Sequence, residues 1–383
     1  MTALVLPWLP DRHLGVVSTL AHADDLISQV GDLLSAYLRS GEVLTIREVP
    51  SGAVSNAVVE AIAPIPRSVP LLVADALVTL RAAIEHTLFT EVEFLNGGPL
   101  DEKSARSVEM PASHTYEDFA DWVKGRARRT PAAMAKGSEL LRRIEGLQPY
   151  HRNIRPDLHP LARLALHTNH SKHRTPAITA VRLVTIIQDN AVPQSLSEVD
   201  LRPEVPLSVG DVIARTPLGR RVPSSLFPTI GINRPDTGQW PILMHELDEI
   251  SCWVREQAVP RLVTGGHPPP EKIPASYKID VGHVDERKAI GLGTPTAAAV
   301  RNKIRMGAAT ARQNLVDLLL PMSADLTTKM ITAWAAQLSD EDVLERVRRL
   351  TAGPRDDLDL VDRNLGVLAA LSDEVWQFKE AAS

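Results

Sequence analysis

Two short segments of this chain concentrate side chains that could exchange protons or bind phosphate. The first is Leu80-Arg81-Ala82-Ala83-Ile84-Glu85-His86, and the second is Asn169-His170-Ser171-Lys172-His173-Arg174. Histidine changes its charge near neutral pH, and the guanidinium of arginine binds phosphate through paired hydrogen bonds. We therefore consider Arg81 and His86 candidate catalytic residues. The side chains considered to support them are Glu85, Arg163, His167, Asn169, His170, Lys172, His173 and Arg174.

The first segment lies on a predicted helix. Apolar residues recur with helical spacing over residues 70–92, which indicates one continuous buried face. Arg81 and Glu85 fall on one flank of that face and can pair one helical turn apart. His86 falls on the opposite flank, about 140° from Arg81. The two candidates therefore share one site only if the helix is distorted or if a second chain completes the site.

The second segment ends another predicted helix, which begins near Pro160. Arg163, His167, His170 and Arg174 lie within about 60° of one another on its flank. They form a basic stripe, and five of the chain's 12 histidines lie between residues 151 and 173. Such a stripe is suited to phosphate binding.

Interpretations without catalysis remain open for both segments. A buried polar network that ties the two helices together is one alternative, because buried charges need partners, and its members would be Arg81, Glu85, His86, His170, His173 and Arg174. Lys172-His173-Arg174 can instead satisfy the last carbonyls of its helix. A metal ion held by His167 and His170 is the weakest alternative, since no paired metal-binding motif accompanies them. We predict neither a metal nor a cofactor.

The order of several motifs resembles that of a family of uncharacterised bacterial proteins. The family carries L-R-S-A-L-D-H, then L-Q-P-Y, then H-P-L and N-x-D-K-H-R. The corresponding segments of this chain, in the same order, are 80–86, 147–150, 159–161 and 169–174. Ala82 replaces the serine, and Ser171 replaces the acidic residue before Lys-His-Arg. The resemblance covers residues 1–262 and implies no known activity.

The spacing of Arg81 and His86 is also similar to the R-x4-6-H motif of the HEPN superfamily, which includes metal-independent ribonucleases. The resemblance implies that His86 acts as general acid or base, that Arg81 stabilises the pentacoordinate phosphate, and that a homodimer forms the site. RNA would be the partner, in a toxin or phage-defence setting. The competing hypothesis is a non-catalytic interaction protein whose polar cluster is structural. A catalytic His86 must be reachable from a cleft.

Composition narrows the class of protein. The 383 residues carry a net charge of -5, which argues against a protein that coats nucleic acid or an anionic membrane. Cys252 is the only cysteine, so an intramolecular disulfide is excluded. The longest apolar candidate, residues 69–80, carries Asp75 and is too short to span a membrane. We expect a cytoplasmic protein without a membrane segment.

The remaining patterns predict a mainly α-helical protein of two domains. Residues 1–263 should form a helical domain with a small antiparallel β-sheet, whose strands lie within about 181–233. A hairpin is predicted at residues 43–62, and further helices at 11–38, 131–147 and 242–259, the last with His245-Glu246 on its exposed side. Residues 264–276 contain two glycines and three prolines and are predicted to be a linker.

Residues 277–383 should form a C-terminal helical bundle. Arg301, Arg305 and Arg312 give its first helix a partial basic face, which offers a surface for RNA or for a protein partner. Just before that helix, Gly291-Leu292-Gly293 could cradle an anion, although a plain turn explains these residues equally well. No internal repeat is present.

Overall fold

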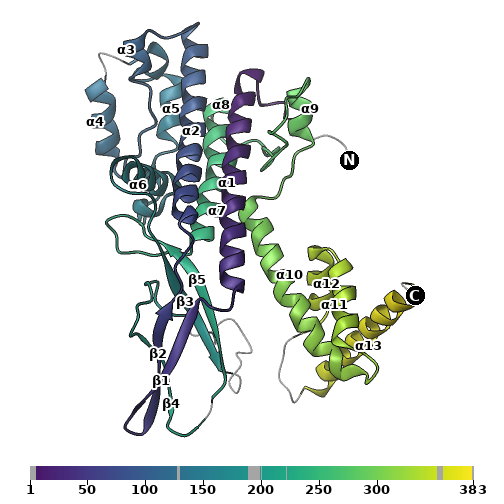
Figure 1. Ribbon diagram of the computed structural model, residues 1–383. Coiled ribbons are helices and arrows are strands. Elements are labelled where there is room, and N and C mark those ends of the chain that lie inside the picture. Colours follow the sequence, from purple (N-terminus) through teal and green to yellow (C-terminus); the bar gives the residue numbers. More distant parts are fainter. Residues whose placement is uncertain are drawn as a thin grey trace. The chain divides into compact units, whose positions relative to one another are not determined.

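Helices form most of the computed structural model, which describes residues 6–126, 130–188, 199, 201–220, 222–351 and 357–381 (Figure 1). The predicted fold class, mainly α with small antiparallel sheets, is confirmed. Contacts between residues divide the chain into two units. The first contains Met1–Val184, Arg202–Arg220 and Phe227–Ala299, and the second contains Thr185–Leu201, Arg221–Leu226 and Val300–Ser383.

The first unit is organised around two long helices, α1 (Leu14–Arg39) and α2 (Ser68–Asn96), which pack along each other. Their apolar faces are buried, as the helical spacing predicts, and Val30 of α1 and Leu77 of α2 have no exposed surface. A 3₁₀ turn, Asp11–His13, precedes α1. Helix α2 ends at Gly97, whose φ of 79° is the left-handed conformation that favours glycine at a helix end.

Two further helical segments complete this core. Helix α6 (Pro160–His173) packs against α2. Helix α7 (Leu243–Trp253) continues through a π-helical turn, Val254–Ala258, into α8 (Val259–Thr264), so the helix predicted at 242–259 extends one turn further. This continuous segment also packs against α2, and Val254 and Leu262 are fully buried. Apolar side chains of all these helices form one core.

Short elements connect α2 to α6. They are α3 (Glu102–Ala105), α4 (Tyr116–Arg126), the 3₁₀ turns Ala132–Met134, Pro149–His151 and Pro156–Leu158, and α5 (Glu139–Glu145). The single helix predicted at 131–147 is therefore wrong. Gly137, with a φ of 88°, interrupts it, and Ser138 begins α5 by accepting a hydrogen bond from the Leu141 amide.

The strands form two sheets rather than one. The predicted hairpin is confirmed as β1 (Leu44–Ser51) and β2 (Val54–Ile62), and β4 (Val212–Pro217) pairs with the other edge of β2. Strand β3 (Thr179–Gln188) pairs with β5 (Ser224–Ile232) in a separate two-stranded sheet. The strands predicted within 181–233 are thus divided, because the middle one completes the hairpin sheet.

The segment predicted as a linker packs against the first unit. Ile273 is 1% exposed, and the Trp8 indole donates a hydrogen bond to the Glu271 carbonyl. Helix α9 (Glu286–Gly291) follows, and the Ala298 amide donates to the Asp24 carboxylate at 2.7 Å. Contacts therefore assign residues as far as Ala299 to the first unit.

Helices of the second unit surround their own apolar core. They are α10 (Ala298–Leu319), whose start belongs to the first unit, the 3₁₀ turn Leu320–Met322, α11 (Thr328–Gln337), α12 (Asp340–Arg348) and α13 (Leu358–Ala381). Leu315, Ile331 and Leu371 are fully buried in this core. Arg312 holds the helices together, since its guanidinium donates to Asp340 at 2.7 Å and to the Ala335 and Leu338 carbonyls. Within the described residues, no helix combines the length and apolarity needed to cross a membrane.

Candidate functional site

Arg81 and Glu85 hold a single loop residue between them. Their side chains form the expected ion pair at 2.6 Å, one turn apart on α2. The Met110 amide donates a hydrogen bond to Glu85 Oε2 at 2.9 Å, and the Met110 carbonyl accepts one from the Arg81 guanidinium. The Met110 side chain is buried. We call these contacts the Met110 clasp, because they satisfy both backbone polar groups of a buried loop residue.

Burial governs the acidity of Glu85. Its partial removal from water raises the pKa of this carboxyl, because the charged form loses hydration. The positive charge of Arg81 and the Met110 amide oppose this shift without cancelling it. Arg81 is shared between the carboxylate and the Met110 carbonyl, so it compensates the burial of Glu85 only in part.

His86 lies apart from Arg81. It is exposed, as its position on the opposite flank of α2 predicts, and no hydrogen bond or ion pair joins it to Arg81 among the residues that the structure describes. The residues lining the cavity beside Arg81 do not include His86. A single chain therefore does not bring the predicted catalytic pair together.

The cavity beside Arg81 has a volume of about 530 Å³, and residues of both predicted clusters line it. Arg81 of α2 and Asn169 of α6 both line it, together with His114 and Trp122. His114 lines this space together with the carboxylates of Glu109 and Asp118, and sequence reasoning missed it because it lies in a polar loop without a helical or motif signal. Its position beside Arg81 and Asn169 follows only from how the loop folds back over α6.

Two other motif residues position these helices. Gln148 is fully buried, accepts a hydrogen bond from the Ser113 amide and donates one to the Ile144 carbonyl. His159 begins α6, because its Nδ1 accepts a hydrogen bond from the Leu161 amide at 3.2 Å. Burial, with the nearby arginines, lowers the pKa of His159 to about 4. The imidazole is thus neutral near pH 7 and able to accept this bond.

The buried half of the second cluster surrounds Glu246 of α7. This carboxylate is 1% exposed and binds Arg163 at 2.7 Å, Arg234 at 2.6 Å and His167 at 3.2 Å. We call this group the Glu246 network. The expectation that Glu246 lies on the exposed side of its helix is wrong, since α6 packs against α7 and covers it. Arg163 also binds Glu249 at 2.6 Å, nearer the surface.

Positive neighbours outweigh burial at Glu246. Burial by itself would raise the pKa of the carboxyl, but the hydrogen bonds from His167 and Arg234 and the charges of Arg163 and Arg234 lower it well below its usual range. Arg163 and His167, predicted to support phosphate chemistry, are thus 4% and 3% exposed and bound to this glutamate. Sequence reasoning missed Arg234, which reaches the network from the turn after β5.

The rest of the second cluster lies at the surface. Asn169, Lys172, His173 and Arg174 are exposed at the end of α6, and His170 is half-buried. Arg174 approaches Asp236 at 3.4 Å. The basic stripe is therefore divided: its first turns join a buried network, and its last turn faces solvent. Cations at that position complement the negative end of the helix dipole.

Among the residues with a described placement, no three His, Cys, Asp or Glu side chains are grouped so as to hold an ion. Cys252 is half-buried, and burial raises the pKa of its thiol, which keeps it in the less reactive protonated form.

Comparison of the chain with protein-family models, with curated proteins and with solved structures produced no match. The resemblances to the uncharacterised bacterial family and to the HEPN superfamily therefore stay predictions.

Proposed function

We propose that this protein acts by binding a partner and not by catalysis, and that its Arg, Glu and His clusters build the fold. The observation that carries this proposal is the burial of Glu246 among Arg163, Arg234 and His167. Each of these side chains already has a charged partner, and a buried pair is costly to open. A catalytic group must instead reach its substrate.

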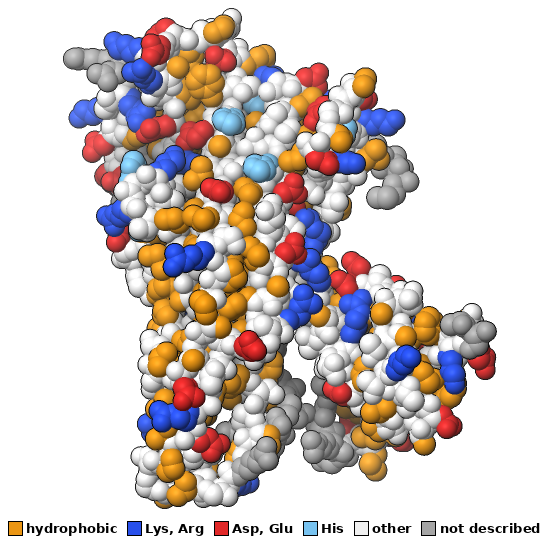
Figure 2. Space-filling model, in the orientation of Figure 1, with side chains coloured by type: hydrophobic (Ala, Val, Ile, Leu, Met, Phe, Trp, Pro, Cys, Tyr) orange, Lys and Arg blue, Asp and Glu red, His pale blue; other side chains and the backbone are white. Residues whose placement is uncertain are grey.

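The Met110 clasp supports the same proposal. Arg81 Nη2 and the Glu85 carboxylate bind each other and the Met110 backbone, which anchors this loop to α2. The charge distribution agrees with it. On the face drawn in Figure 2, Lys and Arg side chains lie among Asp and Glu side chains over the helices of the first unit, a pattern that a polyanion would not favour.

The exposure of His86 favours a second candidate function, metal-independent RNA cleavage at a site shared by two chains. An exposed His86 of one chain is free to approach the Arg81 cavity of a second chain. Lys172 and His173, which are also exposed, would then contact phosphate groups. This candidate requires a homodimer, whereas the binding proposal does not.

One experiment separates the two candidates. Total RNA is incubated with the purified protein in excess EDTA, beside His86→Ala and Arg81→Ala variants, and each variant's thermal unfolding is recorded. Under the binding proposal the wild type leaves the RNA intact, Arg81→Ala lowers Tm, and His86→Ala leaves Tm unchanged. Cleavage by the wild type that disappears in His86→Ala would overturn the binding proposal, and light scattering would then establish whether the active species is a dimer.

A further inference from the structure

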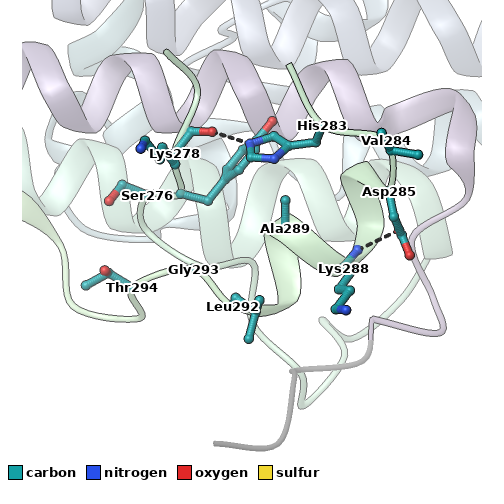
Figure 3. Close-up of a pocket in the computed structure, with 11 residues that line it drawn as sticks. Ser276, Lys278, His283, Val284, Asp285, Lys288, Ala289, Leu292, Gly293 and Thr294 are labelled. Carbon is teal, nitrogen blue, oxygen red and sulfur yellow. Dashed lines mark hydrogen bonds between the residues drawn. The ribbon is translucent and has the colours of Figure 1, made fainter. Parts of the chain in front are cut away.

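A further cavity lies away from both clusters, and hydrogen bonds fix several of the residues that line it. Its volume is about 600 Å³, and it lies between the segment 276–278, the His283 ring, and α9 with the turn that follows (Figure 3). The Thr294 amide donates to the Ser276 carbonyl at 2.7 Å, which joins the two sides. Gly293 permits this approach, because a Cβ there would lie 2.6 Å from the Ser276 oxygen.

Tyr277, which lines this cavity, is held against α1. The Tyr277 hydroxyl contacts Ser18 Oγ at 2.6 Å and donates to the Glu286 carboxylate. Burial and the hydrogen bond to Glu286 raise the pKa of Tyr277 to about 12, so the hydroxyl keeps the proton that it donates to this carboxylate. The Tyr277 and His283 rings lie 6.0 Å apart, and Ala289 points toward the space beneath the His283 ring (Figure 3). The cavity therefore has an aromatic side that does not depend on ligand binding.

Its lining combines apolar surface with unpaired positive charge. Leu292 is 57% exposed and Val284 is fully exposed, so the rim presents apolar groups to solvent. Lys278 and Lys288 also line the cavity, and within the described parts of the chain neither ammonium group has an ion pair. The acidic neighbour Asp285 accepts a hydrogen bond from the Lys288 backbone amide, as the cap of α9.

We propose that this cavity binds a small organic anion, in which an apolar ring or branched chain carries a carboxylate, sulfonate or phosphate group. Its volume lies in the range of small-molecule sites, which are mainly apolar with a few polar groups that orient the ligand. The apolar body would lie against Ala289, Leu292 and the Tyr277 ring. The anionic group would meet Lys278 or Lys288 at the rim. The proposal is independent of the two clusters described above.

The test uses the full-length protein and 8-anilinonaphthalene-1-sulfonate, a fluorescent anion with an aromatic body. We expect saturable binding that Leu292→Asp weakens about tenfold or more, because it places a negative charge at the apolar rim. A Lys278→Met/Lys288→Met double variant keeps the apolar stems and should weaken binding up to about fivefold per lysine. Lys329→Met, at an exposed position on α11, is the matched control and should change nothing.

Competition then identifies the chemistry of the ligand. Displacement of the probe by 1-naphthoate or phenyl phosphate, but not by inorganic phosphate, would show that the site needs both an apolar body and an anionic group. Absence of saturable binding, or binding that Leu292→Asp and the double lysine variant leave equal to the Lys329→Met control, would overturn the proposal. Circular dichroism of each variant ensures that a weaker signal reflects the site and not unfolding.

Discussion

Two carboxylates beside arginine, the half-buried Glu85 and the buried Glu246, have pKa values shifted in opposite directions. Glu85 has one cationic neighbour, Arg81, whose guanidinium also serves the Met110 carbonyl, and burial raises its pKa. Glu246 is buried more deeply, yet His167, Arg234 and Arg163 lower its pKa. The number of cations on a carboxylate therefore decides the direction of its pKa shift here, more than the depth of its burial.

The difference also separates two kinds of polar cluster. The Glu246 network keeps a charge inside the fold by surrounding it with opposite charges, so the loss of Glu246 removes the carboxylate that its buried cationic partners share. The Met110 clasp mainly satisfies backbone groups, and its loss exposes one loop. We therefore expect substitutions in the Glu246 network to lower the free energy of unfolding more than substitutions in the Met110 clasp.

The largest effect should follow Glu246→Gln. The amide keeps the shape of the side chain but leaves Arg234 without its carboxylate and Arg163 with Glu249 alone, and we expect a loss of about 3–5 kcal/mol in the free energy of unfolding. Urea denaturation measures it. Glu249→Gln is the control: Glu249 also binds Arg163 but is 44% exposed, and should cost at most about 1 kcal/mol. Equal losses in the two variants would contradict the comparison.

A third buried carboxylate, Glu91, sharpens the same comparison. It is 2% exposed and binds His13 at 2.7 Å and Arg12 at 2.8 Å. Although burial acts to raise its pKa, hydrogen bonds from His13 and Arg12 lower it, so it should behave like Glu246. We expect Glu91→Gln to cost about 2–3 kcal/mol in urea denaturation, since Arg12 is partly exposed and can regain water. A cost below that of Glu249→Gln would show that cation number is not the deciding factor.

The Met110 clasp should contribute less. Arg81→Ala removes both the ion pair and the hydrogen bond to the Met110 carbonyl, and we expect a loss of about 1–3 kcal/mol. His86→Ala, on the exposed flank of the same helix, should change stability by less than about 0.5 kcal/mol. Thermal unfolding of the two variants compares them directly. A larger loss for His86→Ala would mean that His86 has a structural partner.

The smallest expected effects concern how the free energy of unfolding changes with pH. Both carboxyls have an ordinary pKa of 4.5 in the unfolded chain. Glu246, with its lowered pKa, contributes stability that is present above that value and is lost as pH falls through the folded pKa. Glu85, with its raised pKa, contributes stability that is present below that value and is lost as pH rises through the folded pKa.

The two glutamine variants should therefore respond to acid in opposite ways. Between about pH 7 and about pH 4, the cost of Glu246→Gln relative to wild type should decrease, whereas that of Glu85→Gln should increase. Urea denaturation at both pH values checks the sign. Slopes of the same sign would refute the assignment of opposite pKa shifts.

Much of this fold could be predicted because it depends on local patterns. The apolar spacing along α1 and α2 places each helix, and Gly97 ends α2. The i, i+4 spacing of Arg81 and Glu85 predicts their pair, and the opposite position of His86 predicts its separation from Arg81. These are properties of one helix and need no knowledge of its neighbours.

The long-range partners of the polar side chains were decided by tertiary structure alone. Arg234 and Glu246 come from segments far from Arg163 in the sequence, and only the packing of α6 on α7 brings them together. The separation of β3 and β4 into different sheets has the same origin, since β2 offers a free edge to β4. A sequence carries helical periodicity in neighbouring residues, but the choice among several possible long-range contacts depends on which surfaces bury together.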